Sequence, residues 1–205
     1  MHWQRLNRDT SIKVLDSVRS EAHMGMFAIG STEVKTATLP FYNDIDLYRV
    51  TNFASVPSFT FEYLGDSKFF QYLDGTEEPI YKTNDKGALT LNDYNVVEYL
   101  RFFFERVSLD EFPDFEIITS LHDMPLLDSL GPAVFASLAQ KHKLPEIKQN
   151  EADNSFTIEA DVYVDAQVLR AKITVSAKGR VSITDQEMIV HEMNNGMIAP
   201  EEAAY

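Results

Sequence analysis

The sequence predicts an α+β protein built mainly from antiparallel sheet. Three observations support this class: strand-like segments occur in runs, helical segments fall between them without strict alternation, and the last third shows a clear period of two. We expect a curved antiparallel sheet packed on a central amphipathic helix, followed by a C-terminal three-stranded meander. No repeat or linker divides the 205 residues, so we expect one domain over 1–205.

The first half contains short segments of strand composition separated by turn residues. These segments are 47–51, 59–63, 69–73 and 80–83. Before them, residues 9–22 carry apolar side chains at helical spacing, and we expect a helix there. The tripeptide Ile12-Lys13-Val14 also suits a strand.

The central helix is expected to begin at Thr90, Asn92 or Asp93, any of which could cap it, and to run to about residue 107. Its apolar positions are Val96, Val97, Leu100, Phe103, Phe104 and Val107. Three further aromatic residues lie outside this stripe: Tyr94, Tyr99 and Phe102. Either a curved sheet surrounds the helix, or the helix also forms a surface for a partner or ligand.

A second helix is expected over 132–142, with Gly131 as its cap and Pro132 as its first residue. Its expected buried face consists of Val134, Phe135, Leu138 and Ala139. Between the two helices, residues 115–119 have strand composition.

The C-terminal meander is predicted from three alternating segments, 156–164, 169–177 and 181–190. In the first, even positions are apolar, and the odd positions Thr157, Glu159, Asp161 and Tyr163 should face water. In the third segment the apolar side chains switch from odd positions (Val181, Ile183) to even ones (Met188, Val190). This switch predicts a β-bulge near 185–187. The polar segment 144–154 is expected to be a surface loop or a domain seam, and the tail 192–205, which lacks periodicity, a mobile end.

Composition excludes several classes of protein. The chain has no cysteine, so disulfides, thiolate metal sites and cysteine nucleophiles are ruled out. Thirty-two acidic residues against 18 basic ones give a net charge of −14, which argues against nucleic-acid binding. No segment approaches the ~20 apolar residues that would span a membrane. The basic N-terminus is followed by polar residues rather than by the apolar stretch of a signal peptide. We expect a soluble cytoplasmic protein.

Motifs for cofactor chemistry are missing from the sequence. No glycine pair suits a dinucleotide fingerprint or P-loop, and the five histidines lack metal-ligand spacing, so we expect no cofactor and no metal. One loop, between the 115–119 strand and the second helix, carries four groups able to act in acid–base or nucleophilic catalysis: His122, Asp123, Asp128 and Ser129. Helix capping and turn formation explain the same residues, and we favour that interpretation over an enzyme.

Charge is unevenly distributed along the chain. From 107 to 140 there is no lysine or arginine, and the acids there include Asp110, Glu111 and Asp114; after Arg180 there are five acids and no base. The sequence thus favours a non-catalytic protein that acts by association, with a basic protein partner or with itself as a homodimer. The alternative is a small-molecule binding protein or cofactor-free enzyme, with a pocket between sheet and helix lined by Tyr63, Phe70, Tyr72, Tyr99 and Phe103.

Overall fold

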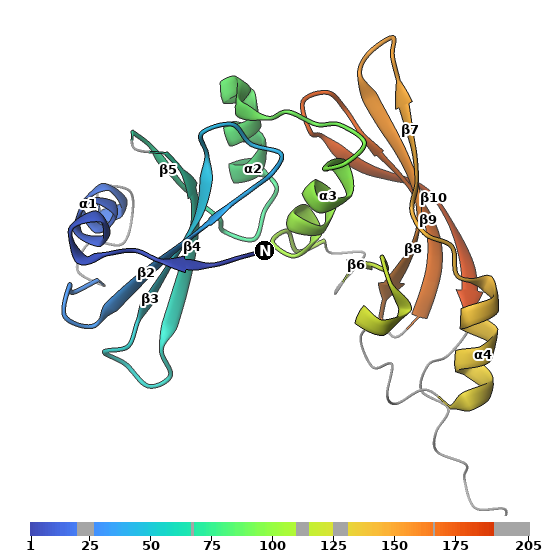
Figure 1. The fold of residues 1–205 in the computed structure, drawn as a ribbon, viewed down its shortest axis with the longest axis horizontal. Helices are drawn as coiled ribbons and strands as arrows, with labels where there is room; N and C mark the ends of the chain where they lie inside the picture. The colour runs from blue at the N-terminus through green and yellow to red at the C-terminus, as the bar shows by residue number, and fades with distance from the viewer. Residues whose placement is uncertain (20–26, 67, 110–114, 125–130, 166, 191–205) are drawn as a thin grey trace, which may run out of the picture. The chain divides into compact units, whose positions relative to one another are not determined.

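The computed structural model describes residues 1–19, 27–66, 68–109, 115–124, 131–165 and 167–190 (Figure 1). The chain divides into two compact units, Met1–Asn95 and Val96–Tyr205. Each contains a five-stranded sheet in which every pairing is antiparallel, so the predicted α+β class with antiparallel sheet is confirmed. The single-domain assignment stays a prediction, because compactness does not determine whether the two units unfold together.

The first unit is a sheet of neighbouring hairpin strands with one helix on its face. The strands lie in chain order: β1 (Gln4–Arg5), β2 (Thr32–Thr38), β3 (Asp46–Asn52), β4 (Phe59–Gly65) and β5 (Phe70–Tyr72). Helix α1 (Arg8–Arg19) contributes Val14, Leu15 and Val18 to a core that also contains Val34, Val50 and Tyr63. Since side chains alternate along a strand, these three sheet residues lie on one face, the face that α1 covers.

Most of the predicted elements of this unit are confirmed. The segments 47–51, 59–63 and 69–73 are β3, β4 and β5, and the helix predicted over 9–22 is α1 as far as residues are described. The strand expected at 80–83 is wrong, because this segment belongs to helix α2 (Glu78–Thr83), which is followed by the helical turn η1 (Asn84–Ala88). Pro79 starts α2, and Thr83 bonds through Oγ1 to the Pro79 carbonyl one turn earlier.

The second unit contains the C-terminal meander. Its elements are α3 (Val96–Phe104), β6 (Glu116–Ile117), η2 (Leu121–Asp123), α4 (Pro132–Lys141), β7 (Glu146–Asn150), β8 (Ser155–Val164), β9 (Gln167–Val175) and β10 (Val181–Val190). The sheet order is β10-β9-β8-β6, and β7 pairs with the first half of β8. Figure 1 shows α3 and α4 on opposite sides of this sheet. The meander and both helices are thus confirmed, but α3 begins at Val96, after the expected caps Thr90, Asn92 and Asp93, and ends at Phe104 rather than near residue 107. Sheet curvature around α3 stays a prediction.

Two details of the meander bear on the sequence analysis. The ladder between β9 and β10 shifts register between Ile183 and Asp185, next to the expected bulge, and shifts again between Met188 and Val190. The loop expected at 144–154 is wrong over Glu146–Asn150, which forms β7. Its side chains are mainly exposed, so the strand lacks the hydrophobic alternation that would reveal it.

Burial also differs from expectation on two faces: the face of β8 predicted to be exposed and the face of α4 predicted to be buried. Asp161 and Tyr163, expected to face water, are buried, because the end of α4 and the residues after it cover this half of the face. On α4, Leu138 is buried, but Phe135 is 41% exposed and Ala139 is exposed, so the predicted buried face is wrong at these two positions. The helix contacts the sheet through a stripe narrower than the sequence suggests.

The helices of the described ranges include none with the length and apolarity needed to cross a bilayer. The tail 192–205, predicted to be mobile, lies outside those ranges.

Candidate functional site

The loop proposed for catalysis contains a short helical turn. His122 lies in η2 with its side chain exposed, and its backbone N–H donates to Oγ of Ser120, 3.3 Å away. Ser120 therefore caps η2, although it was not among the four residues that the sequence analysis considered. Asp123 completes η2, whereas Asp128 and Ser129 lie outside the described residues. A catalytic role for these four residues stays a hypothesis.

The aromatic residues around α3 divide into one exposed and two buried side chains. Tyr94 precedes the helix and is 95% exposed, whereas Tyr99 and Phe102 are buried. The hydroxyl of Tyr99 donates to the Gly179 carbonyl at 2.6 Å and so connects α3 to the turn before β10. Tyr99 and Phe102 are therefore not exposed contacts on this helix, whereas their role in lining a pocket stays a prediction. The acids Asp110, Glu111 and Asp114 lie outside the described residues.

The aromatic residues expected to share one pocket come from both units. Tyr63, Phe70 and Tyr72 belong to the first unit, where Tyr63 and Phe70 are buried in the core under α1. Tyr99 and Phe103 belong to the second. Within the first unit, Tyr63 and Phe70 therefore serve as core residues, and the partly buried Tyr72 packs against that core.

Strand β10 is a sheet edge. It is ten residues long and pairs with β9 on one side, and no other described strand pairs with it. Backbone N–H and C=O groups at a sheet edge can pair with another extended chain. Two backbone groups of β10 are bonded to side chains: the Gln186 N–H donates to Oδ1 of Asp185 at 2.9 Å, and the Ile189 carbonyl accepts from Nζ of Lys141 in α4 at 3.0 Å.

All the charged side chains of β10 are acidic. Asp185, Gln186 and Glu187 are exposed side by side, and Met188 after them is 41% exposed. No lysine or arginine follows Arg180 anywhere in the chain. The edge thus combines backbone groups that do not pair with β9 and exposed acidic side chains, with Asp185 and Glu187 lying opposite Lys172 and Arg170 of β9. In the sequence it forms part of the base-free region after Arg180.

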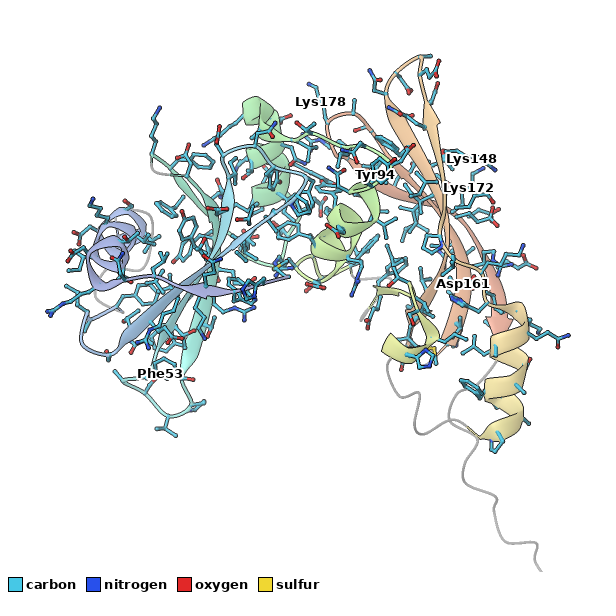
Figure 2. All side chains as sticks on the ribbon, viewed as in Figure 1. Phe53, Tyr94, Lys148, Asp161, Lys172 and Lys178 are labelled. Carbon is cyan, nitrogen blue, oxygen red and sulfur yellow. The ribbon has the colours of Figure 1, made fainter. Side chains whose placement is uncertain are left out.

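A buried ion cluster holds the end of α4 against the sheet, and Figure 2 shows Asp161 on the side of the sheet where α4 lies. The Asp161 side chain is fully buried. Its Oδ1 accepts from Nε of Arg170 at 3.0 Å and lies 2.9 Å from Nη2. Its Oδ2 accepts from the Lys143 backbone N–H at 2.7 Å and lies 2.9 Å from Nδ1 of His142.

This cluster is suited to structure rather than to chemistry. A carboxylate only accepts hydrogen bonds, so Nδ1 of His142 donates. The buried Nε2 has no partner in the part of the chain that the structure describes. Arg170 also donates from Nη2 to the Lys141 carbonyl at 2.9 Å, so one guanidinium joins β9 to the last turn of α4. With both carboxylate oxygens occupied and enclosed, Asp161 cannot reach a substrate.

The sequence analysis missed this cluster. Asp161 occupies one of the odd positions of its strand, which the alternation predicts to face solvent. His142, Asp161 and Arg170 also lie in three different elements or their connections, so no local motif joins them. One signal was available: β8 places Asp161 opposite Arg170 on β9, and opposite charges facing each other across a hairpin stabilise it.

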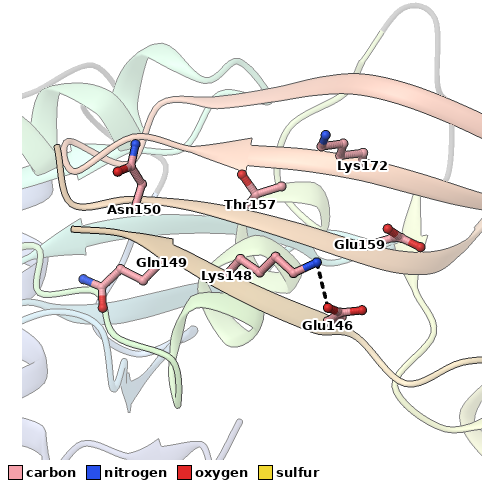
Figure 3. A pocket seen from close by; sticks show the side chains of 7 residues that line it. All are labelled: Glu146, Lys148, Gln149, Asn150, Thr157, Glu159 and Lys172. Atoms are coloured by element: carbon pink, nitrogen blue, oxygen red, sulfur yellow. Dashed lines mark ion pairs between the residues drawn. The ribbon is translucent and has the colours of Figure 1, made fainter. Parts of the chain in front are cut away.

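A polar groove of about 290 Å³ lies on the open part of the same sheet (Figure 3). Its lining is Glu146, Lys148, Gln149, Asn150, Thr157, Glu159 and Lys172. Lys148 pairs with Glu146 at 2.8 Å, and this hydrogen bond and charge lower the pKa of Glu146 and raise that of Lys148. Both side chains are more than 60% exposed, so the pair contributes little to stability.

Comparison with known proteins identified no relative. No family model, no curated protein and no solved structure matches this chain.

Proposed function

We propose that this chain acts by binding another protein, which adds an extended segment with basic side chains to the edge of β10. The observation that carries the proposal is a ten-residue edge strand with exposed Asp185 and Glu187. Adding a strand to an exposed edge is a common mode of peptide recognition, in which backbone bonds supply affinity and side chains supply specificity. The cytoplasm is the proposed location, since the sequence shows no signal peptide or membrane-spanning segment and its lack of cysteine is compatible with a reducing compartment.

Charge supports a basic partner over a second copy of this chain. Two copies of β10 related by a two-fold axis and paired antiparallel about Gln186 would place Asp185 opposite Glu187 in both directions. Pairing about either acid would place that residue opposite itself. Like charges directly opposite destabilise an antiparallel pair, whereas lysines opposite both acids stabilise it.

The test is a short capped peptide of valine and threonine that carries two lysines separated by one residue. We expect it to bind at least roughly fourfold more tightly than the same peptide with two glutamates, because two opposite-charge pairs, each worth at least ~0.2 kcal/mol, replace two like-charge pairs that cost a similar amount. Bound peptide should shift and protect the backbone amides of residues 182–188 in nuclear magnetic resonance and hydrogen-exchange measurements.

Charge reversal supplies the control. The variant D185K/E187K should prefer the glutamate peptide, whereas D93K/E151K, which makes the same change in net charge at two other exposed acids, should keep the wild-type preference. If both variants respond alike, net charge rather than the edge governs binding. If light scattering shows a dimer that D185K/E187K abolishes, the edge binds a second copy and the proposal of a basic partner is wrong.

A further inference from the structure

A cleft in the first unit lies between the start of α1 and strands β1 and β2. Its volume is about 300 Å³, at the lower end of the range for small-molecule sites. It is lined by Arg5, Leu6, Arg8, Ser11, Leu15, Ile29, Thr32, Glu33 and Val34. The cleft involves none of the residues of β10, so it can be tested independently of the proposed function.

The apolar side of the cleft is formed by the edge of the core. Leu15 and Val34 are each 1% exposed and belong to the core under α1, and the half-buried Leu6 packs against it. Ile29, which is 42% exposed, stands at the solvent side. Leu15 and Val34 therefore close the floor of the cleft, and Leu6 and Ile29 supply its accessible apolar contacts.

The polar side contains an unsatisfied hydroxyl. Oγ1 of Thr32 is buried and has no hydrogen-bond partner among the described residues, whereas the other hydroxyl of the cleft, that of Ser11, donates to the Asn7 carbonyl at 2.8 Å. A buried polar group without a partner costs stability, so such groups are rare unless a ligand or water satisfies them. Thr32 is therefore available to donate to a bound molecule.

The charges of the cleft favour an anion. The Glu33 carboxylate lies 3.2 Å from Nε of Arg5 and 2.9 Å from Nζ of Lys35, so two cations already neutralise it. Arg8, exposed at the start of α1, adds a further guanidinium. In a chain of net charge −14, this is a local reversal of sign. Guanidinium groups bind carboxylates through planar, charge-assisted hydrogen bonds.

We propose that this cleft binds a small aliphatic carboxylate. Its carboxylate oxygens accept from the Arg8 guanidinium and the Thr32 hydroxyl, and its chain lies along Leu6, Leu15, Ile29 and Val34. A carboxylate has two acceptor oxygens for these two donor groups, and the apolar side chains beside them favour a ligand with a short hydrocarbon chain over an inorganic anion.

The test is a titration of the full chain with octanoate, octanol and acetate. Octanoate should shift the backbone amide signals of Leu6, Arg8 and Thr32 saturably in nuclear magnetic resonance spectra. Octanol, which lacks the charge, and acetate, which lacks the chain, should each bind at least roughly fivefold more weakly. Equal affinity for octanol, the absence of saturable shifts, or shifts confined to residues after 95 would overturn the proposal.

Two variants locate the binding groups. Thr32→Val keeps the side-chain shape and removes the unsatisfied hydroxyl, so octanoate affinity should fall roughly tenfold while the melting temperature does not fall. Arg8→Gln should weaken octanoate similarly, whereas Lys13→Gln, an exposed cation on the same helix that does not line the cleft, should leave affinity unchanged. Unchanged affinity in Thr32→Val or Arg8→Gln would contradict the assignment.

Discussion

Replacement of Arg170 by methionine should destabilise the second unit through the buried ion cluster. Methionine keeps the apolar stem of the side chain and removes the guanidinium, so the change isolates the charge. It would remove the two contacts with Oδ1 of Asp161, at 3.0 and 2.9 Å, and the bond to the Lys141 carbonyl. The Asp161 carboxylate would stay enclosed, with His142 and the Lys143 backbone as its remaining donors.

The expected cost follows from burial. Breaking a buried ion pair by removing one partner costs about 3–5 kcal/mol, because the remaining charge is left without compensation. Asp161 is fully buried, but the Arg170 side chain is 18% exposed and two donors remain on Oδ2, so we expect a loss of about 3 kcal/mol, at the lower end of that range. The free energy of unfolding of a typical domain is about 5–15 kcal/mol, so this loss would be a large share of it.

The assay is urea unfolding followed by far-ultraviolet circular dichroism. Lys172→Met is the matched control, because Lys172 lies two residues further along β9 and is exposed, and it should change the free energy of unfolding by less than about 0.5 kcal/mol. The double variant D161N/R170M should lose less than the sum of the two single variants, since neither charge remains. Equal effects of Arg170→Met and Lys172→Met would refute the reasoning.

Three further predictions concern packing and titration. Gly65→Ala should lower the free energy of unfolding by about 1–3 kcal/mol, because the added Cβ would lie 2.6 Å from a backbone carbonyl oxygen, whereas Gly30→Ala meets nothing within 4 Å and should be tolerated in the same urea experiment. Tyr99→Phe should cost about 1 kcal/mol through its lost hydrogen bond, and Tyr94→Phe, at an exposed ring, close to nothing. Burial first, and then two nearby carboxylates, raise the pKa of Tyr48 above its ordinary 10.0, so its contribution to stability should be present below the unfolded pKa and lost as pH rises through the folded value; phenolate absorbance compared with Tyr48→Phe measures this.

Elements with strong local signals were predicted correctly from the sequence. The alternation in β8 and β9 and the helical spacing in α3 are periodic patterns that each element needs for its own packing, so they are visible without tertiary information. Strand β7 and helix α2 were missed or misassigned. Strand β7 is mostly exposed, so its sequence lacks the alternation of apolar and polar residues. Helix α2 is six residues long, too short to show a helical period.

The candidate sites were predicted less well than the fold. The acidic character of the β10 region was evident from composition, but its position as a sheet edge depends on which strands pair. The cleft beside α1 combines residues from β1, α1 and β2, and its informative feature, the unsatisfied hydroxyl of Thr32, exists only once the neighbours of that side chain are known.

The sequence by itself determined the α+β class, the C-terminal meander, the two main helices of the second unit and the concentration of acid after Arg180, because period and charge are properties of consecutive residues. Tertiary structure decided burial. It enclosed Asp161 and Tyr99, which the local pattern placed outside, and left Phe135 exposed, because burial depends on which element covers a face and that pairing joins residues distant in the chain.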